Sequence, residues 1–163
     1  MSVELLNSNQ TTQKEDNNFS NTDAELAVIG CILWDNKNYE KISEFLNETH
    51  FVDETNKIIF STITKLLDKN VLVSPITLKN YLPEDNEKLN KVNFLNQLKD
   101  STPSTHNTYN YGRIVYDLYV KRNLISVAHN IIQETNSNTS ESAENLIEIA
   151  ENDLFNLSQS GNS

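Results

Sequence analysis

The feature that most constrains the fold is a stretch of about thirty residues, 105–135, that contains no proline and one glycine. Its recurring positions fall on one face of an α-helix. They are Tyr111, Ile114, Val115, Leu118, Arg122, Ile125, Ala128 and Ile132. At 1.5 Å per residue such a helix is about 45 Å long, more than the width of a small domain. The sequence therefore predicts a helix whose apolar face its own domain covers only in part.

A second amphipathic segment follows after the polar turn 136–139. Glu141 and Glu144 lie in its predicted first turn, where carboxylates favour a helix. Its apolar positions again recur every three or four residues: Ala143, Leu146, Ile147, Ala150, Leu154 and Leu157, with Phe155 adjacent. Two such helices joined by a short turn form an αα-hairpin. An uncovered apolar stripe on the hairpin predicts contact with another chain.

The preceding residues, 22–104, predict several short helices. Residues 22–25 read as a capping box in which Thr22 caps and Glu25 reaches back. Gly30 interrupts the first apolar helix, which indicates the close approach of a neighbouring element. Asp53 is the predicted N-cap of a helix over 54–69, and Ser74 that of a helix through Leu82. Further helices are expected over 39–46 and around 89–98, and residues 71–73 are expected to form a buried connector.

No segment shows sustained alternation of apolar and polar residues, so we expect an all-α protein, a small helical globular head followed by a long protruding αα-hairpin. The expected divisions are a disordered tail over 1–21, the head over 22–104 and a helical hairpin over 105–159.

Charge and composition exclude several classes of protein. Thirteen Lys and Arg against 23 Asp and Glu give a net charge of −10, which opposes strong binding to DNA or to an anionic membrane. The single cysteine, Cys31, excludes a disulfide framework and is expected in the core. We find no signal peptide, membrane helix or glycine-rich phosphate loop, which favours a cytoplasmic protein without a cofactor of its own.

Catalytic and metal-binding residues are not predicted. The three histidines, His50, His106 and His129, are too far apart in sequence for a metal site, and His106 fits the turn before the long helix. The acidic pairs 53–54 and 84–85 occupy cap or turn positions, where carboxylates have structural roles.

Three cations on the long helix allow three interpretations. Arg113, Lys121 and Arg122 either form a solvated face paired with glutamates of the second helix (Glu144, Glu148 or Glu151), or contact a second protein, or contact DNA.

An ordered set of motifs resembles the N-terminal domain of the DnaB family of bacterial replicative helicases. The segments are AELAVIGCIL (24–33), Phe51, IIF (58–60), 76–82, FLNQL (94–98), TPSTHN (102–107), YGRIV (111–115), KRNLI (121–125) and AENDLF (150–155). The chain departs from the family pattern at Asn56, where histidine is common, and at Ser74, where aspartate is expected. A glycine pair usual before the fifth helix is missing around residues 90–91.

The resemblance implies an assembly and primase-docking domain that supports a hexamer built as a trimer of dimers in the primosome. Implied partners are a second copy, the C-terminal domain of primase and a helicase loader, at the bacterial replication fork. The hairpin over 105–159 would be the dimerising element. The family continues through a linker, which residues 160–163 would begin, into a RecA-like ATPase domain, so catalysis, ATP and Mg²⁺ are expected only there.

The residues that we expect at the protein interface are Arg113, Leu118, Arg122, Ile125, Ile132, Leu146, Ile147, Leu154 and Phe155. Two other hypotheses remain open at this point: a small helical DNA-binding regulator, which would need a basic stripe, and a small hydrolase, for which we find no nucleophile and base.

Overall fold

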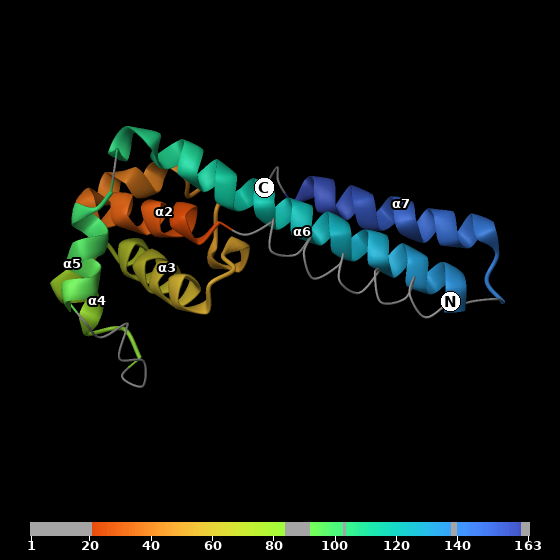
Figure 1. Ribbon diagram of the computed structural model, residues 1–163, viewed down its shortest axis with the longest axis horizontal. Helices are drawn as coiled ribbons and strands as arrows, with labels where there is room; N and C mark the ends of the chain where they lie inside the picture. Colours follow the sequence, from red (N-terminus) through yellow and green to blue (C-terminus); the bar gives the residue numbers. More distant parts are fainter. Residues whose placement is uncertain (1–20, 84–91, 103, 138–139, 161–163) are drawn as a thin grey trace, which may run out of the picture. The chain divides into compact units, whose positions relative to one another are not determined.

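A computed structural model describes residues 21–83, 92–102, 104–137 and 140–160 (Figure 1). Over these ranges the chain forms helices and no strand, which confirms the all-α prediction. It divides into an N-terminal unit, Asn21–Tyr116, and a C-terminal unit whose described part is residues 117–137 and 140–160. The predictions for the tail up to residue 20, for the acidic pair 84–85, for the residues around 89–91 and for 161–163 lie outside the described residues.

The N-terminal unit is organised around α2 (Thr22–Trp34), which contacts several other elements of the unit. Val28, Ile29 and Ile32 are fully buried, and so is Cys31, which confirms its predicted place in the core. Because α2 is buried on several faces, its apolar residues are continuous rather than confined to one stripe. Asn21, not Thr22, is the N-cap: its Oδ1 accepts a hydrogen bond from the amide of Ala24 at 2.9 Å.

The predicted capping box at the start of α2 is therefore wrong, and Glu25 has another role. Its side chain is buried and accepts hydrogen bonds from the amide of Val52 at 2.5 Å and from the amide of Asp53 at 3.3 Å. Asn56 Nδ2 donates a third bond at 2.9 Å. Asn56, a departure from the family pattern, is thus a partner of this buried carboxylate. Glu25 joins α2 to the segment that begins α3.

The capping predictions for the next two helices are confirmed. Asp53 accepts from the amide of Asn56 and begins α3 (Glu54–Asp68). Ser74 caps α4 (Pro75–Lys79), which ends before the expected Leu82. α5 covers Val92–Asp100. Short 3₁₀ helices connect these elements: η2 (Asn36–Lys41), η3 (Glu48–His50) and η4 (Thr105–Asn107).

Several short-range predictions need correction. The expected helix over 39–46 is the 3₁₀ helix η2 followed by turns. In the connector 71–73, Val73 is buried but Leu72 is 78% exposed, so the connector is buried only in part. In so short a connector, the sequence does not indicate whether an apolar side chain points into the core or toward solvent.

Two glycines of the N-terminal unit allow close packing. A Cβ on Gly30 would lie 2.0 Å from Thr102 Oγ1 and 2.8 Å from the carbonyl oxygen of Leu98, which confirms the predicted close approach. A Cβ on Gly112 would lie 2.7 Å from Ile42 Cγ2. The glycines of the first helix and of the YGRIV motif therefore serve packing.

The long helix predicted over 105–135 is α6 (Thr108–Ser137), preceded by η4, which contains His106 as expected for the turn. α6 begins in the N-terminal unit and continues into the C-terminal unit. There, α7 (Ala143–Gln159) lies antiparallel beside the second half of α6 (Figure 1). The hairpin is thus present.

Candidate protein interface

The described part of the C-terminal unit contains no fully buried residue. α7 has none along its 17 residues. The four buried residues of α6 are Thr108, Gly112, Val115 and Tyr116, all within the N-terminal unit. Within the described part of this unit, two helices packed on each other leave most of their apolar surface exposed.

The predicted interface residues divide by exposure. Leu118, Arg122, Ile125 and Leu146 are half-buried, whereas the others are exposed. Among the exposed ones, Phe155 is 61%, Ile132 59%, Ile147 58% and Leu154 43% exposed. Large apolar side chains with this exposure, gathered on one hairpin, are typical of a surface that another protein covers.

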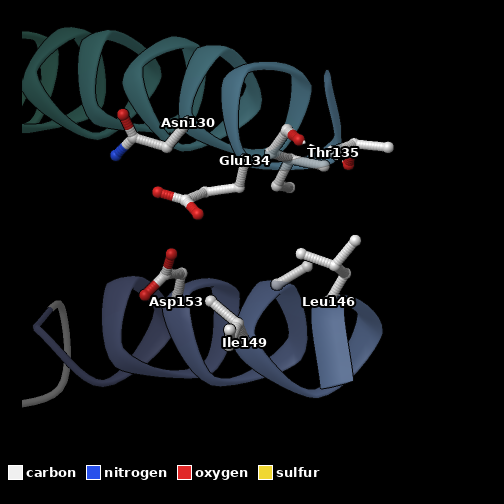
Figure 2. Close-up of a pocket in the computed structure, with 8 residues that line it drawn as sticks. Asn130, Glu134, Thr135, Leu146, Ile149 and Asp153 are labelled. Carbon is white, nitrogen blue, oxygen red and sulfur yellow. Dashed lines mark hydrogen bonds between the residues drawn. The ribbon is translucent and has the colours of Figure 1, made fainter. Parts of the chain in front are cut away.

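The seam between α6 and α7 holds a cavity of about 20 Å³. It is lined by Asn130, Ile131, Glu134, Thr135, Leu146, Ile149, Ala150 and Asp153. Figure 2 shows the carboxylates of Glu134 and Asp153 facing each other from the two helices. Leu146, one of the predicted interface residues, therefore faces α6 within the hairpin.

Two apolar stripes do not line this cavity. Leu118, Ile125 and Ile132 recur every seven residues, which places them on one face of α6. Ile147 and Leu154 have the same spacing on α7. Because residues seven apart lie above one another on a helix, each set forms a continuous stripe of the kind that pairs helices from different chains.

The three cations of α6 have different surroundings. The Arg113 guanidinium lies 5.2 Å from the ring centroid of Phe45 and 5.1 Å from that of Tyr116, in the N-terminal unit. Lys121 Nζ pairs with Asp117 at 2.8 Å, one turn earlier on the same helix. Arg122 lies 6.0 Å from the ring of Tyr119. The ion pair of Lys121 is thus within α6 and not with the glutamates Glu144, Glu148 or Glu151.

His50 and Cys31 have structural surroundings in the N-terminal unit. No group of three metal-ligating side chains occurs in the described ranges. His50 Nδ1 accepts from the amide of Asn47 at 3.1 Å, a capping role. Burial raises the pKa of the Cys31 thiol, although a hydrogen bond with Thr108 and the charge of Lys41 act in the opposite direction. None of the described helices is long and apolar enough to cross a bilayer.

The sequence analysis missed the exposed apolar residues of the N-terminal unit. These are Trp34, Val52, Leu72, Ile76, Tyr81, Tyr109 and Ile114. Tyr109 and Ile114 lie in the first two turns of α6, and the others lie in or beside the shorter helices and connectors of the unit. Only Ile114 carried a sequence signal, since it lies on the long helix whose apolar face was expected to be covered in part.

Comparisons with known proteins support the resemblance. Residues 17–117 match the sequence profile described as "DnaB-like helicase N terminal domain". The replicative DNA helicase DnaB of Rickettsia typhi is 32% identical over 145 residues, covering 87% of this chain and 29% of that protein. The DnaB of Rickettsia conorii is 33% identical with the same coverage, and that of Buchnera aphidicola is 28% identical over 139 residues. The chain thus spans less than a third of the length of these relatives.

Two solved structures are similar to this fold. The N-terminal domain of DnaB helicase from Mycobacterium tuberculosis has a TM-score of 0.71 at 16% identity, covering 84% of this chain and 97% of that one. A DnaB-like replicative helicase, described together with its interactions with primase, has a TM-score of 0.69 at 26% identity. It covers 84% of this chain and 31% of the solved one.

The helical fold and its uncovered hairpin define an all-α domain with a candidate surface for protein association. The chain belongs to the family of DnaB-like helicase N-terminal domains.

Proposed function

We propose that this chain is the N-terminal assembly and primase-docking domain of a replicative DNA helicase. It contributes binding energy and geometry, whereas ATP hydrolysis, with ATP and Mg²⁺, belongs to a separate ATPase domain. The observation that carries this proposal is the absence of fully buried residues in the described part of the C-terminal unit, beside apolar residues as exposed as Ile132 and Ile147.

Self-association would cover the stripes of α6 and α7. A second copy presents the same heptad-spaced apolar residues, so two hairpins can bury them against each other. Charged residues at the edge of the interface between the two copies, such as Arg122, would set the register of one hairpin against the other. A dimer of this kind is the unit from which a trimer of dimers would form.

Primase is the second proposed partner, through its C-terminal domain. Support comes from the solved helicase at 26% identity, whose description names interactions with primase. A helicase loader would be a further partner of the same domain. The domain would act in the bacterial cytoplasm, at the replication fork.

We do not expect this chain to bind DNA strongly. The net charge of −10 repels phosphates, and Lys121 is already paired with Asp117. A gel shift at low salt should show no retardation of single- or double-stranded DNA. Tight binding that weakens steeply with salt would instead favour the DNA-binding regulator.

The test of self-association is the mass of the chain by light scattering over a range of concentrations. We expect a dimer or a larger assembly, which Leu154→Glu dissociates while the far-UV circular dichroism stays helical. Asn152→Glu is the matched control, because Asn152 is exposed on α7 and lies outside the two stripes. A strict monomer at high micromolar concentration, or an unchanged mass for Leu154→Glu, would count against the proposal.

The test of docking is a calorimetric titration with the C-terminal domain of primase, with the mass recorded at the same concentrations. Saturable binding to the associated chain is expected. A self-associated chain that binds no primase would contradict the docking role and leave an architectural one.

A further inference from the structure

A second concave site lies within the N-terminal unit. It is a pocket of about 300 Å³ between η2 and the carboxyl end of α3. Its lining residues are Asn36, Lys37, Tyr39, Glu40, Leu67, Asp68, Asn70, Val71 and Leu72.

Hydrogen bonds fix the walls of this pocket. Asn70 has a positive φ of 58°, and its amide donates to the carbonyl of Leu67 at 2.8 Å. The amide of Val71 donates to the carbonyl of Leu66 at 2.9 Å, which completes a Schellman cap. On the other side, the Asn36 side chain donates to the carbonyl of Val73 and accepts from its amide, at 2.9 and 2.8 Å. The connector is therefore held against η2 rather than free.

The electrostatics of the pocket favour a cation. Glu40 and Asp68 are exposed carboxylates that come from two different elements. The carboxyl end of the 15-residue α3 adds the negative end of a helix dipole. Lys37 is the one cation among the nine lining residues and offsets one of these charges.

Tyr39 supplies a neutral polar group at this site. Burial raises the pKa of its phenol, and the nearby carboxylates of Asp68 and Glu48 raise it further, against a hydrogen bond with Thr64 that lowers it. A neutral phenol can accept a hydrogen bond from a bound cation.

The rim of the pocket is apolar. Leu72 is 78% exposed, and Val71 and Leu67 are half-buried beside it. A cationic side chain with an aliphatic stem could lay that stem on Leu72 while its charged end reaches the carboxylates. Arginine fits better than lysine because its planar guanidinium has five donors and is weakly hydrated.

We propose that this pocket binds an arginine side chain, next to an apolar residue, from a partner protein. The occupant is argued from charge complementarity at the pocket and from the net charge of −10, which draws basic segments to the domain. The inference does not depend on the association of the hairpins, because the lining residues all belong to the N-terminal unit.

The probe is the peptide acetyl-Ala-Arg-Leu-amide, titrated into the full ¹⁵N-labelled chain and followed by amide chemical shifts. Its matched control is the same peptide with citrulline, which keeps the shape of arginine but lacks the charge. We expect saturable shifts at Glu40, Asp68, Val71 and Leu72 with the arginine peptide and none with the citrulline peptide.

Variants locate the site. The double substitution Glu40→Gln with Asp68→Asn should weaken binding about tenfold, because two partly screened ion pairs are lost. Glu44→Gln, an exposed carboxylate outside the lining, should leave the affinity unchanged. Equal binding of both peptides, shifts elsewhere on the chain, or no saturable shifts at all would overturn the proposal.

Discussion

The central helix of the N-terminal unit and the second helix of the hairpin have opposite surroundings. α2 buries eight of its 13 residues, whereas α7 buries none of its 17. The apolar residues of α2 are continuous, whereas those of α7 are interrupted by polar and charged residues. The two helices also differ in the number of elements around them: α5, η2 and α3 contact α2, whereas α6 lies beside α7. A helix with one neighbour needs a further surface to bury its second apolar stripe.

The sharpest test compares two phenylalanines. Phe60 is fully buried in α3 and Phe155 is 61% exposed on α7. Phe60→Ala should lower the free energy of unfolding by about 3–5 kcal/mol. Phe155→Ala should lower it by less than about 1 kcal/mol in the monomer. Urea unfolding at low concentration measures both, and similar losses would contradict the contrast between the units.

The same contrast holds for carboxylates. Glu25→Ala leaves the amide of Val52 and the Asn56 side chain without their buried partner, so we expect a loss of about 3 kcal/mol. Glu144→Ala removes an exposed carboxylate from the first turn of α7 and should cost about 0.5 kcal/mol. The two unfolding midpoints provide the measurement. A small effect at Glu25 would mean that water replaces the lost carboxylate as acceptor for the three donors.

Adding a methyl group tests the packing of α2. Alanine is normally better than glycine in a helix by about 1 kcal/mol. Gly30→Ala should nevertheless destabilise the chain by about 1–3 kcal/mol, because the new Cβ meets Thr102 and the Leu98 carbonyl. Ser126→Ala, at an exposed position of α6, should stay within about 0.5 kcal/mol of the parent. A stabilising Gly30→Ala in thermal unfolding would show that α5 moves away easily.

The smallest expected effect is a pH dependence of the folding stability that comes from the buried Cys31 thiol. Burial holds the pKa of Cys31 above its ordinary value of 9.0, so between 9.0 and the folded-state pKa the native chain keeps a proton that the unfolded chain has lost. Stability contributed in this way is complete below pH 9.0 and falls as pH rises further. Cys31→Ala should flatten this fall in urea midpoints. If the urea midpoints of Cys31→Ala fell with pH as steeply as those of the parent, other titrating groups would cause the fall.

Local signals predicted much of this fold. Asp53 and the Ser74-Pro75 pair each act within their own first helical turn, so their capping roles could be read from adjacent residues. The long helix was predicted because its apolar periodicity continues without a proline.

Long-range partners could not be predicted in the same way. Thr22 and Asn21 are both good caps, and only the fold decides between them. The partners of Glu25 lie 27 to 31 residues away, and no short motif encodes that distance. The pocket at Tyr39 joins residues 36–40 with 67–72 for the same reason. The interface residues on the hairpin remain a prediction, which the mass measurements test.

The single cysteine of the chain, fully buried in α2, has a practical consequence. A thiol reagent can reach Cys31 only when the core of the N-terminal unit opens, so the labelling rate reports the population of opened molecules. Fraying of the hairpin leaves this rate unchanged. The chain therefore carries a built-in kinetic reporter for one of its units, and mixing it with a partner would show whether binding slows that opening.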